Sequence, residues 1–553
     1  MKIPALLALL SPLALADGQI TSLQTIGYFQ GGLGPVLDED DRFGAAVARL
    51  GDVDGDGVQD IAVGAPGTQT YGMDGAVWIL LLQTDGSVKS ATRIDAADIG
   101  HPYDVSSFGR AVGKMGDFDG NGVPDVIVGG IEEQLFSDKG VAHILCLNAD
   151  GSLASTHEVS VGMQVLSFGA SVVGVGDVDG DGIRDAAVGM PGDYAFASDG
   201  DVFLILLNAD GSEKSSVRIS DGQGGFAGPL MFGDHFGSAL TQLSDLDGNG
   251  VRELAVGASD DDDGYSSGAG HPGAVWVLFL DNTGQVIDQQ KISEFEGDLG
   301  LDLNSGDHFG TAMGAADVDD DGILDLVVGG ETHLWVLILR SDGSVRATLE
   351  FDPESFGLDA DVGFALGANV LPDIDGDGHV ELVVGSPESL FGGLERGSVQ
   401  IAFFDGVSPA QVLPLGCDLN PAGSLVVHGL PIPGKTMHFK IDNPLGTQTP
   451  WQTVPLLSLS FHGTGPGCGI SVPGWGMNPA APSGELLSLQ TPGLPLMTNG
   501  NWQGTPMEFV YEIPPLPGLL GLEAYVQGVF VDFSASPQVP IGLTRARKLL
   551  FGI

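Results

Sequence analysis

Positively charged residues are scarce in this chain of 553 residues, which contains 21 lysines and arginines against 73 aspartates and glutamates. The formal charge of −52 argues against binding to nucleic acids and to anionic membrane surfaces, because both present phosphate groups. The same imbalance favours a protein that holds divalent cations, since clustered carboxylates repel one another without a counter-ion. Disorder is not expected, because hydrophobic residues make up 43% of the chain and recur in regular blocks.

The chain contains three cysteines, Cys146, Cys417 and Cys468. A fold that depends on disulfides is not expected with so few cysteines in a chain of this length. Cys146 lies in an apolar segment and should pack as a small buried hydrophobic residue. Whether Cys417 and Cys468 form a pair is left open by the sequence.

Long hydrophobic runs are absent beyond the N-terminus. No later stretch approaches the ~20 apolar residues that a membrane helix needs, so no transmembrane segment is expected. Residues 1–16 begin with Met1 and Lys2, continue with a short apolar stretch and end in Ala14-Leu15-Ala16. This is the pattern of a secretory signal peptide cleaved after Ala16. We therefore expect a secreted protein, either extracellular or held at a cell surface.

A sequence unit of about 60 residues occurs six times between Phe43 and Gly406. Each unit opens with an aromatic residue and a short apolar strand, followed by an acidic, glycine-rich loop and a strand that ends in Val-Gly. A third strand, a tight turn that is most often Asp-Gly, and a fourth strand follow. The opening aromatic residues are Phe43, Phe108, Phe168, Phe236, Phe309 and Phe364. Glycine follows five of them, whereas Ala365 follows the sixth.

The strands of each unit are short runs of β-branched and apolar residues, too short to be helices. Four antiparallel strands per unit predict the blade of a β-propeller, and the ring must close because blades bury their faces only against neighbouring blades. Residues 20–26 resemble a fourth strand, while the sixth unit has only a proline-broken stretch after Asp405 and Gly406. We therefore predict an all-β fold, a six-bladed β-propeller closed by the N-terminal strand, with seven blades as the alternative.

The six acidic loops share one spacing of oxygen ligands. The first loop has carboxylates at positions 1, 3, 5 and 9, a backbone carbonyl available at position 7, and a glycine at position 6 that permits a sharp turn. Hard oxygen donors favour calcium over zinc, so we predict about six Ca²⁺ ions, one per loop. The candidate ligands are Asp52, Asp54, Asp56, Val58 and Asp60; Asp117, Asp119, Asn121, Val123 and Asp125; Asp177, Asp179, Asp181, Ile183 and Asp185; Asp245, Asp247, Asn249, Val251 and Glu253; Asp317, Asp319, Asp321, Ile323 and Asp325; Asp373, Asp375, Asp377, His379 and Glu381.

Two other interpretations of these loops fit less well. An EF-hand needs a glutamate at position 12 between flanking helices, whereas position 12 is a valine within a strand in all six loops. Simple acidic Asp-Gly turns do not need a carboxylate at position 9, yet every loop has one.

These residues resemble the FG-GAP repeats of integrin α-chain propellers and of secreted bacterial proteins. The resemblance extends from about Phe43 to Gly406 and implies a propeller fold with calcium at the loop positions given above. The chain departs from integrin α chains in having six repeats where they have seven blades, and in having an acidic loop in every repeat. The resemblance therefore implies fold and calcium binding more firmly than any particular partner.

Other motifs are interpreted as structural. The segment Gly264–Gly268 has the Gly-x-Ser-x-Gly spacing but lacks the strand and helix of a nucleophile elbow. His235 and His308 occupy a repeat position that accepts varied residues, so we assign it to surface or packing. Residues Asp260–Asp263 are expected to form a solvated acidic loop rather than a cation site.

The expected domain organisation is a signal peptide (1–16), the propeller (17–410) and a C-terminal β-sandwich (415–553), where short strands alternate with glycine and proline turns. The expected function is an extracellular calcium-binding module for binding or adhesion, whose partner is an unidentified protein or glycan. The alternatives are a glycan-binding lectin and a hydrolase with a site at the mouth of the propeller channel. We expect no enzyme, because no catalytic constellation recurs in the repeats.

Overall fold

The computed structural model contains two compact units, residues 20–405 and a second unit that includes the C-terminal strands. It describes residues 20–67, 75–100, 105–132, 139–161, 167–192, 199–262, 271–301, 303–304, 306–358, 363–391 and 394–405, and mainly the strands between 411 and 550. Within these residues the secondary structure is β-strand, apart from one 3-10 turn at Pro353–Phe356. No helix there is long and apolar enough to cross a membrane.

The first three repeats form three four-stranded antiparallel sheets, in which each strand pairs with the next along the chain. Blade one contains β2 (Ala46–Gly51), β3 (Asp60–Ala65), β4 (Ala76–Leu82) and β5 (Val88–Asp95). Blade two contains β6 (Val105–Gly116), β7 (Asp125–Glu132), β8 (Lys139–Leu147) and β9 (Leu153–Val159). Blade three contains β10 (Ser171–Gly176), β11 (Asp185–Met190), β12 (Asp201–Leu207) and β13 (Glu213–Ile219).

Repeats four and five form blades of the same kind. Blade four contains β14 (Phe236–Gln242), β15 (Leu254–Ala258), β16 (Ala274–Leu280) and β17 (Val286–Ile292). Blade five contains β18 (Ala312–Ala316), β19 (Asp325–Gly329), β20 (Leu334–Leu339) and β21 (Val345–Phe351). The third strand of every blade is entirely buried where its burial is described, which explains why these strands are mainly apolar instead of alternating.

The sixth blade is completed by the N-terminal strand, as predicted. It contains β22 (Gly367–Leu371), β23 (Glu381–Ser386) and β26 (Ser398–Phe404), with β1 (Ile20–Gly27) as its outermost strand. The pairing of β1 with β26 is antiparallel and runs from Ile20 opposite Phe404 to Gly27 opposite Ser398. The prediction of a six-bladed propeller is therefore confirmed, and the seven-bladed alternative is wrong.

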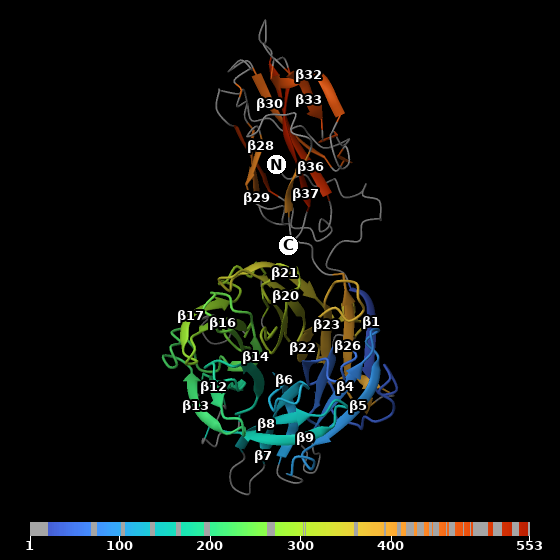
Figure 1. Ribbon diagram of the computed structural model, residues 1–553, viewed down its shortest axis with the longest axis vertical. Coiled ribbons are helices and arrows are strands. Elements are labelled where there is room, and N and C mark those ends of the chain that lie inside the picture. Colours follow the sequence, from blue (N-terminus) through green and yellow to red (C-terminus); the bar gives the residue numbers. More distant parts are fainter. Residues whose placement is uncertain are drawn as a thin grey trace. The chain divides into compact units, whose positions relative to one another are not determined.

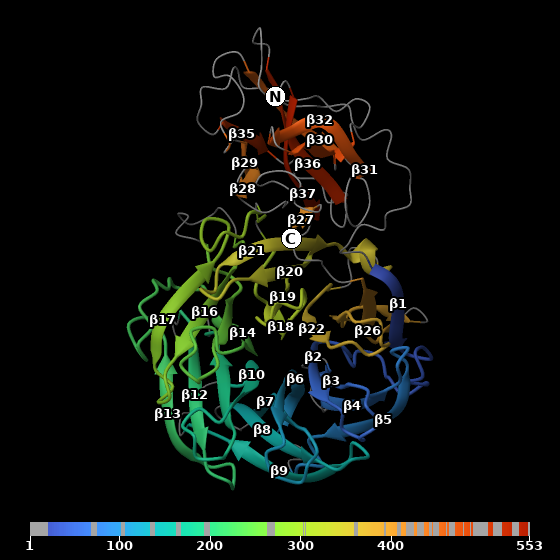
Figure 2. The ribbon, with the colours of Figure 1, turned by 45° about the horizontal axis from the view of Figure 1, so that its top comes forward.

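The ring has the first strand of each blade at its centre and the fourth strand at its rim (Figures 1 and 2). The central strands contact one another in the order β2, β6, β10, β14, β18 and β22, and β22 contacts β2. The apolar clusters lie between blades, so each joins two repeats; one of them includes Ile61 of blade one and Val383 of blade six. The opening phenylalanines are all buried and act as core residues, as predicted.

Glycines make the closest contacts between neighbouring blades. One glycine of each second strand lies against the residue that follows the opening phenylalanine of the next blade, and a Cβ atom on it would overlap that residue's carbonyl oxygen. The pairs are Gly64 with Gly109, Gly129 with Gly169, Gly189 with Gly237, Gly257 with Gly310, Gly329 with Ala365, and Gly385 with Gly44. Both glycines of the repeat are thus explained by one backbone-to-backbone contact, which the last pair uses to close the ring.

Ala365 is the exception at this contact, and it adopts the same left-handed backbone as the glycines it replaces. Its φ angle is 56°, against 96° at Gly44 and 97° at Gly310. An L-residue with a side chain is strained in this region. The sixth blade therefore keeps the geometry of the contact despite the change in residue.

The C-terminal strands form separate small sheets, which we describe by themselves. One has the order β27 (Gln411–Leu415), β37 (Ile541–Leu550), β36 (Glu523–Asp532) and β30 (Thr453–Ser460). Another contains β28 (Leu425–His428), β29 (Thr436–Ile441) and β35 (Met507–Glu512). Short pairs join β31 (His462–Gly463) to β34 (Ser488–Leu489) and β32 (Ile470–Asn478) to β33 (Ala481–Leu486), and in the propeller β24 (Leu390–Phe391) to β25 (Leu394–Glu395).

Strands are therefore present in the predicted C-terminal region, whereas its packing as a β-sandwich stays a prediction. Cys417 and Cys468 lie outside the described residues, as do the predicted signal peptide and the segment Gly264–Gly268. Cys146 is fully buried in the strand where burial was predicted, and that burial raises the pKa of its thiol to about 11.

The contact between blades predicts a large effect of one methyl group. Gly257→Ala should lower the free energy of unfolding by about 3 kcal/mol, because the new Cβ would overlap the Gly310 carbonyl oxygen and Ser238 offers no room beside it. Urea unfolding measures the change. Gly222→Ala is the control, since nothing lies within 4 Å of its Cβ position and only its φ of 65° opposes a side chain. Equal losses in the two variants would contradict the contact.

Candidate metal centre

Each acidic loop connects the first strand of a blade to its second strand, at one end of the central channel. In blade one the loop runs from Asp52, directly after β2, to Asp60, the first residue of β3. Glycines at positions 4 and 6 have positive φ, 76° at Gly55 and 94° at Gly57, and allow the chain to turn back on itself.

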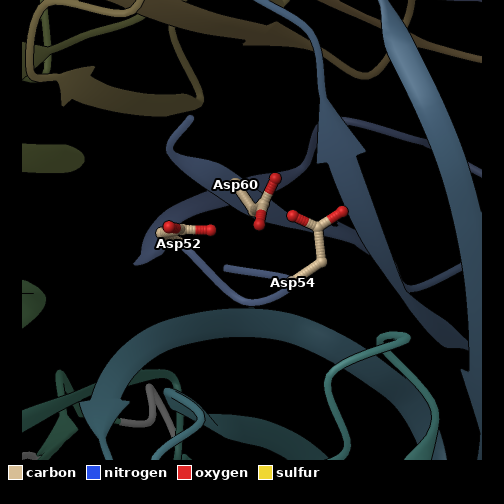
Figure 3. Close-up of side chains that lie close together, drawn as sticks. All are labelled: Asp52, Asp54 and Asp60. Carbon is tan, nitrogen blue, oxygen red and sulfur yellow. The ribbon is translucent and has the colours of Figure 1, made fainter. Parts of the chain in front are cut away.

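The turn brings three carboxylates of the loop together. Figure 3 shows Asp52, Asp54 and Asp60 with their side chains directed toward one another. One carboxylate oxygen from each lies within 4.8 Å of the others, a spacing that can hold a metal ion. The same positions, 1, 3 and 9, meet in four further loops: Asp117, Asp119 and Asp125; Asp177, Asp179 and Asp185; Asp245, Asp247 and Glu253; Asp317, Asp319 and Asp325.

The residue at position 1 is held by backbone N–H groups of its own loop. Asp52 Oδ1 accepts hydrogen bonds from the N–H groups of Gly55 (2.7 Å) and Asp56 (3.0 Å), and its Oδ2 accepts one from Gly57 (2.8 Å). Asp373 in the sixth loop accepts the corresponding three bonds. The backbone thus shapes the loop and fixes the orientation of this carboxylate.

The residue at position 9 connects the loop to the body of the blade. Asp60 Oδ2 accepts from the N–H of Val53 (2.8 Å), and its Oδ1 accepts from the N–H of Leu82 at the end of the third strand (2.9 Å). Asp125, Asp185 and Asp325 make the equivalent pairs of bonds. The carboxylate at position 9 therefore has a structural role, because it ties the loop to the third strand, which a simple turn would not reach.

Burial raises the pKa of every position-9 carboxyl group, and nearby carboxylates raise it further. The pKa is about 6 for Asp60, Asp125 and Asp185, about 7 for Glu253, and about 8 for Asp325 and Glu381. Desolvation is the largest cause in each case. A buried group that ionises so reluctantly is one that a bound cation would stabilise strongly.

The residue at position 5 points toward the outer strand. In blade one, Asp56 Oδ1 accepts from the N–H of Val58 (2.9 Å), while its Oδ2 lies 2.6 Å from Lys89 Nζ. Lys89 also contacts Asp54 Oδ2 at 2.6 Å, so one ammonium group bridges positions 3 and 5. Position 5 is therefore not part of the three-carboxylate group that meets in this structure.

The bridging cation comes from a β-bulge in the fourth strand. The register shifts after Leu81, which leaves Lys89 unpaired in the ladder. Lys214 in blade three bridges Asp179 and Asp181 in the same way, at 2.6 and 2.5 Å. Arg346 in blade five contacts Asp319 and also Asp321, the latter at 3.1 Å. The bulge residues of the other blades are Ala154, Ile287 and Thr21.

The basic bulge residue correlates with the identity of position 5. Where the bulge residue is Ala154 or Ile287, position 5 is an asparagine, and its Nδ2 donates to a backbone carbonyl, as Asn121 does to Leu147 (2.9 Å). Repeats one, three and five thus combine four carboxylates with one cation, and repeats two and four combine three carboxylates with none. Each of these five sites has a net charge of −3, whereas the sixth, with Asp377 and Thr21, has −4.

The sequence reasoning missed this cation because it considered each loop alone. The basic bulge residues lie 21 to 29 positions after the last residue of their loops and meet them only through strand pairing. The sequence does contain a sign of this cation. At the same place after the turn, successive repeats carry in order a lysine, an alanine, a lysine, an isoleucine and an arginine.

The polar residues between blades four and five make specific contacts. The Nδ1 atoms of His235 and His308 both contact Asp260, at 2.9 and 2.7 Å, which is a packing role of the kind assigned from the sequence. The prediction of a solvated acidic loop is wrong at Asp261, which is buried in an ion pair with Lys291 at 2.9 Å. The acidic run instead joins blades four and five.

Comparison with known proteins agrees with this geometry. The FG-GAP repeat model matches residues 43–80, and the FG-GAP-like repeat model matches residues 117–188 and 317–384. The chain carries FG-GAP repeats. Each matched segment contains a loop of the kind described above, so the resemblance inferred from the sequence is confirmed.

Integrin alpha chains are among the relatives of this FG-GAP protein. It is 29% identical to integrin alpha-5 of Xenopus laevis over 237 residues, which cover 40% of this chain and 20% of that protein. It is 34% identical to integrin alpha-PS5 of Drosophila melanogaster over 146 residues, 26% of this chain and 14% of that protein. It is 41% identical to integrin alpha pat-2 of Caenorhabditis elegans over 113 residues, 20% of this chain and 9% of that protein. The chain thus spans a fifth or less of the length of these relatives.

The raised pKa values predict that without metal the protein becomes more stable as the pH falls from about 8 to about 5. Each position-9 group has a higher pKa when folded than when unfolded. The stability that each protonated group contributes is therefore fully present below its pKa in the unfolded chain, and it is lost as the pH rises through the folded pKa of about 6 to 8. Thermal unfolding in chelator at several pH values measures this trend. A melting temperature that falls on acidification within this window would contradict it.

Proposed function

We propose that this protein is an extracellular, calcium-stabilised propeller that acts as a binding or adhesion module. The observation that carries the proposal is the recurrence of converging carboxylates in the loops of a closed ring. The similarity to integrin alpha chains supports adhesion as the role and an extracellular or cell-surface location. The partner would be a protein or a glycan.

The loops fit calcium by their donor chemistry. All side-chain donors at positions 1, 3, 5 and 9 are oxygens, and position 7 would add a backbone carbonyl. Two buried carboxylate oxygens, Asp117 Oδ1 and Glu253 Oε2, have no hydrogen-bond partner among the described residues and would gain one in a bound cation. Of the residues assigned from the sequence, those at positions 1, 3 and 9 already converge, and those at positions 5 and 7 would have to join them around the ion.

Calcium would contribute to stability by mass action. At ~1 mM free calcium and a dissociation constant of ~0.1 mM, one site stabilises the folded state by about 1.4 kcal/mol. Six independent sites would add on the order of 8 kcal/mol, comparable to the whole stability of a typical domain. We therefore expect an unstable or open ring without the metal.

Binding is favoured over catalysis by the groups at the channel. The described residues that line a cavity of about 330 Å³ in the channel include cations and amides but no carboxylate, histidine or cysteine. Such a set can hold a ligand but lacks the paired acid and base of a hydrolase. The residues of this cavity therefore give no support to the hydrolase alternative. The experiment below distinguishes the lectin alternative from binding to a protein partner.

Removing calcium should therefore lower the melting temperature by many degrees and abolish partner binding together. The full chain is measured in calcium and in chelator, by thermal unfolding and by binding to an array of immobilised extracellular proteins and glycans. Protein binding lost in chelator supports adhesion, and glycan-only binding supports the lectin. A melting temperature that does not change with chelator would show that the loops are only acidic turns.

The bridging lysine should affect calcium binding and metal-free stability in opposite directions. Lys89→Met removes a positive charge that contacts two ligand carboxylates, so the first loop should bind calcium about tenfold more tightly. In chelator the same variant should unfold at a lower temperature, because four carboxylates then lack any cation. Isothermal titration calorimetry and thermal unfolding measure the two effects.

Ala154→Met is the matched control, because it places the same side chain on the equivalent bulge of blade two without changing charge. Calcium affinity should stay the same in this variant. Weaker calcium binding in Lys89→Met would overturn the assignment of Lys89 as a substitute for the metal's charge.

A further inference from the structure

Four basic side chains meet at one end of the propeller channel. Arg49 and Lys114 occupy the same position in β2 and β6, three residues before the acidic loops begin. Arg184 and Arg252 occupy position 8 of the third and fourth loops. All four line a single cavity of about 330 Å³, enclosed by the central strands of the blades.

These four cations are unusual in a chain with a net charge of −52. Most other basic side chains of the described propeller pair with acids, as Arg42 does with Glu388 and Arg218 with Asp201, whereas Arg110, which lines a second cavity, forms no ion pair with a described residue. None of the four channel residues forms an ion pair with any described residue. The side chains of Arg49 and Lys114 make no hydrogen bond within the described part of the chain either.

The hydrogen bonds of the two loop arginines leave most of their donors unused. Arg184 Nε donates to the carbonyl oxygen of Asp117 at 3.1 Å, and Arg252 Nη1 donates to Gln242 Oε1 at 3.1 Å. Each guanidinium carries five N–H donors, so several remain. Gln242 also lines the cavity, and its buried Nε2 has no hydrogen-bond partner among the described residues.

The four cations are close enough to act on one another. The pKa of Lys114 is lowered to about 8, first by the protein that surrounds it in the channel and then by the charges of Arg49, Arg184 and Arg252. Like charges held together without acids destabilise the free protein. An anion at the centre of the group would remove this repulsion.

We propose that this end of the channel binds a compact, multiply charged oxyanion of the sulfate or phosphate class. The donors come from four blades around the axis, so they approach from several directions, which suits a tetrahedral anion better than a planar carboxylate. Arginine forks bind such oxyanions through paired hydrogen bonds. The cavity exceeds a single oxyanion and its first waters, so the group can be a free ion or part of a small ester.

This site goes beyond the proposed function and does not depend on it. The oxyanion would meet side chains of first strands and of position 8, none of which is a candidate calcium ligand. The four cations also attract an anionic ligand to one place on a strongly negative chain. At short range the ligand responds to the local electrostatic potential and not to the net charge of the protein.

The test is calorimetric titration of the full chain with inorganic sulfate, in calcium and at constant ionic strength balanced with chloride. Saturable binding of one sulfate is expected, and inorganic phosphate should bind at the same site. Arg49→Gln and Lys114→Met should each weaken it about tenfold or more, because each removes a charged donor. Glucosamine 6-sulfate, titrated in parallel, distinguishes an ester from the free ion by binding more tightly.

Arg93→Gln is the matched control, because Arg93 lies on the outer strand β5, pairs with Asp95 at 2.5 Å and does not line the cavity. It makes the same change in charge and should leave sulfate binding unchanged. Without sulfate, Arg49→Gln should melt at the same or a higher temperature than the unmodified protein, which separates lost binding from misfolding. Binding no stronger than that of chloride, or equal weakening by Arg93→Gln, would overturn the proposal.

Discussion

The contact between two backbones at the glycine pairs constrains the rest of the propeller. A second strand can approach the next blade this closely because its own residue there is always a glycine, and the approach is repeated six times around the ring, once with Ala365 in place of the facing glycine. It sets the distance at which the buried phenylalanines and the apolar third strands of adjacent blades meet. The acidic loops end four residues before these glycines, so their position on the ring follows from the same contact.

Much of this architecture could be predicted because it repeats. The six openings from Phe43 to Phe364, the Val-Gly strand ends and the unpaired strand at residues 20–26 are local patterns in fixed phase, and the pairing of β1 with β26 follows from the missing fourth strand. The loop positions were predictable for the same reason. Calcium itself and the C-terminal sandwich stay predictions.

What sequence reasoning missed depends on contacts between elements. Lys89 meets Asp54 and Asp56 through a bulge in the fourth strand, and Asp260 joins two histidines from different blades. The channel cations were hidden for another reason. They occupy two different repeat positions, so each is an isolated substitution when the repeats are aligned. Only the closed ring brings the four side chains together.

The acidic loops and the basic residues of the channel form separate charged clusters in this protein. Where an acidic loop has a fourth carboxylate in repeats one, three and five, a lysine or arginine from the same blade lies beside it, and where it has asparagine the bulge residue is apolar. In repeats one to five each acidic cluster therefore has either an internal cation or one fewer charge, whereas the sixth, with Asp377 and Thr21, has neither. The channel group follows neither rule, because its cations have no acids even though carboxylates outnumber basic residues in the chain by more than three to one. A protein with this excess of acids could have neutralised four cations at little cost, so their isolation at a shared cavity is the feature that a ligand explains.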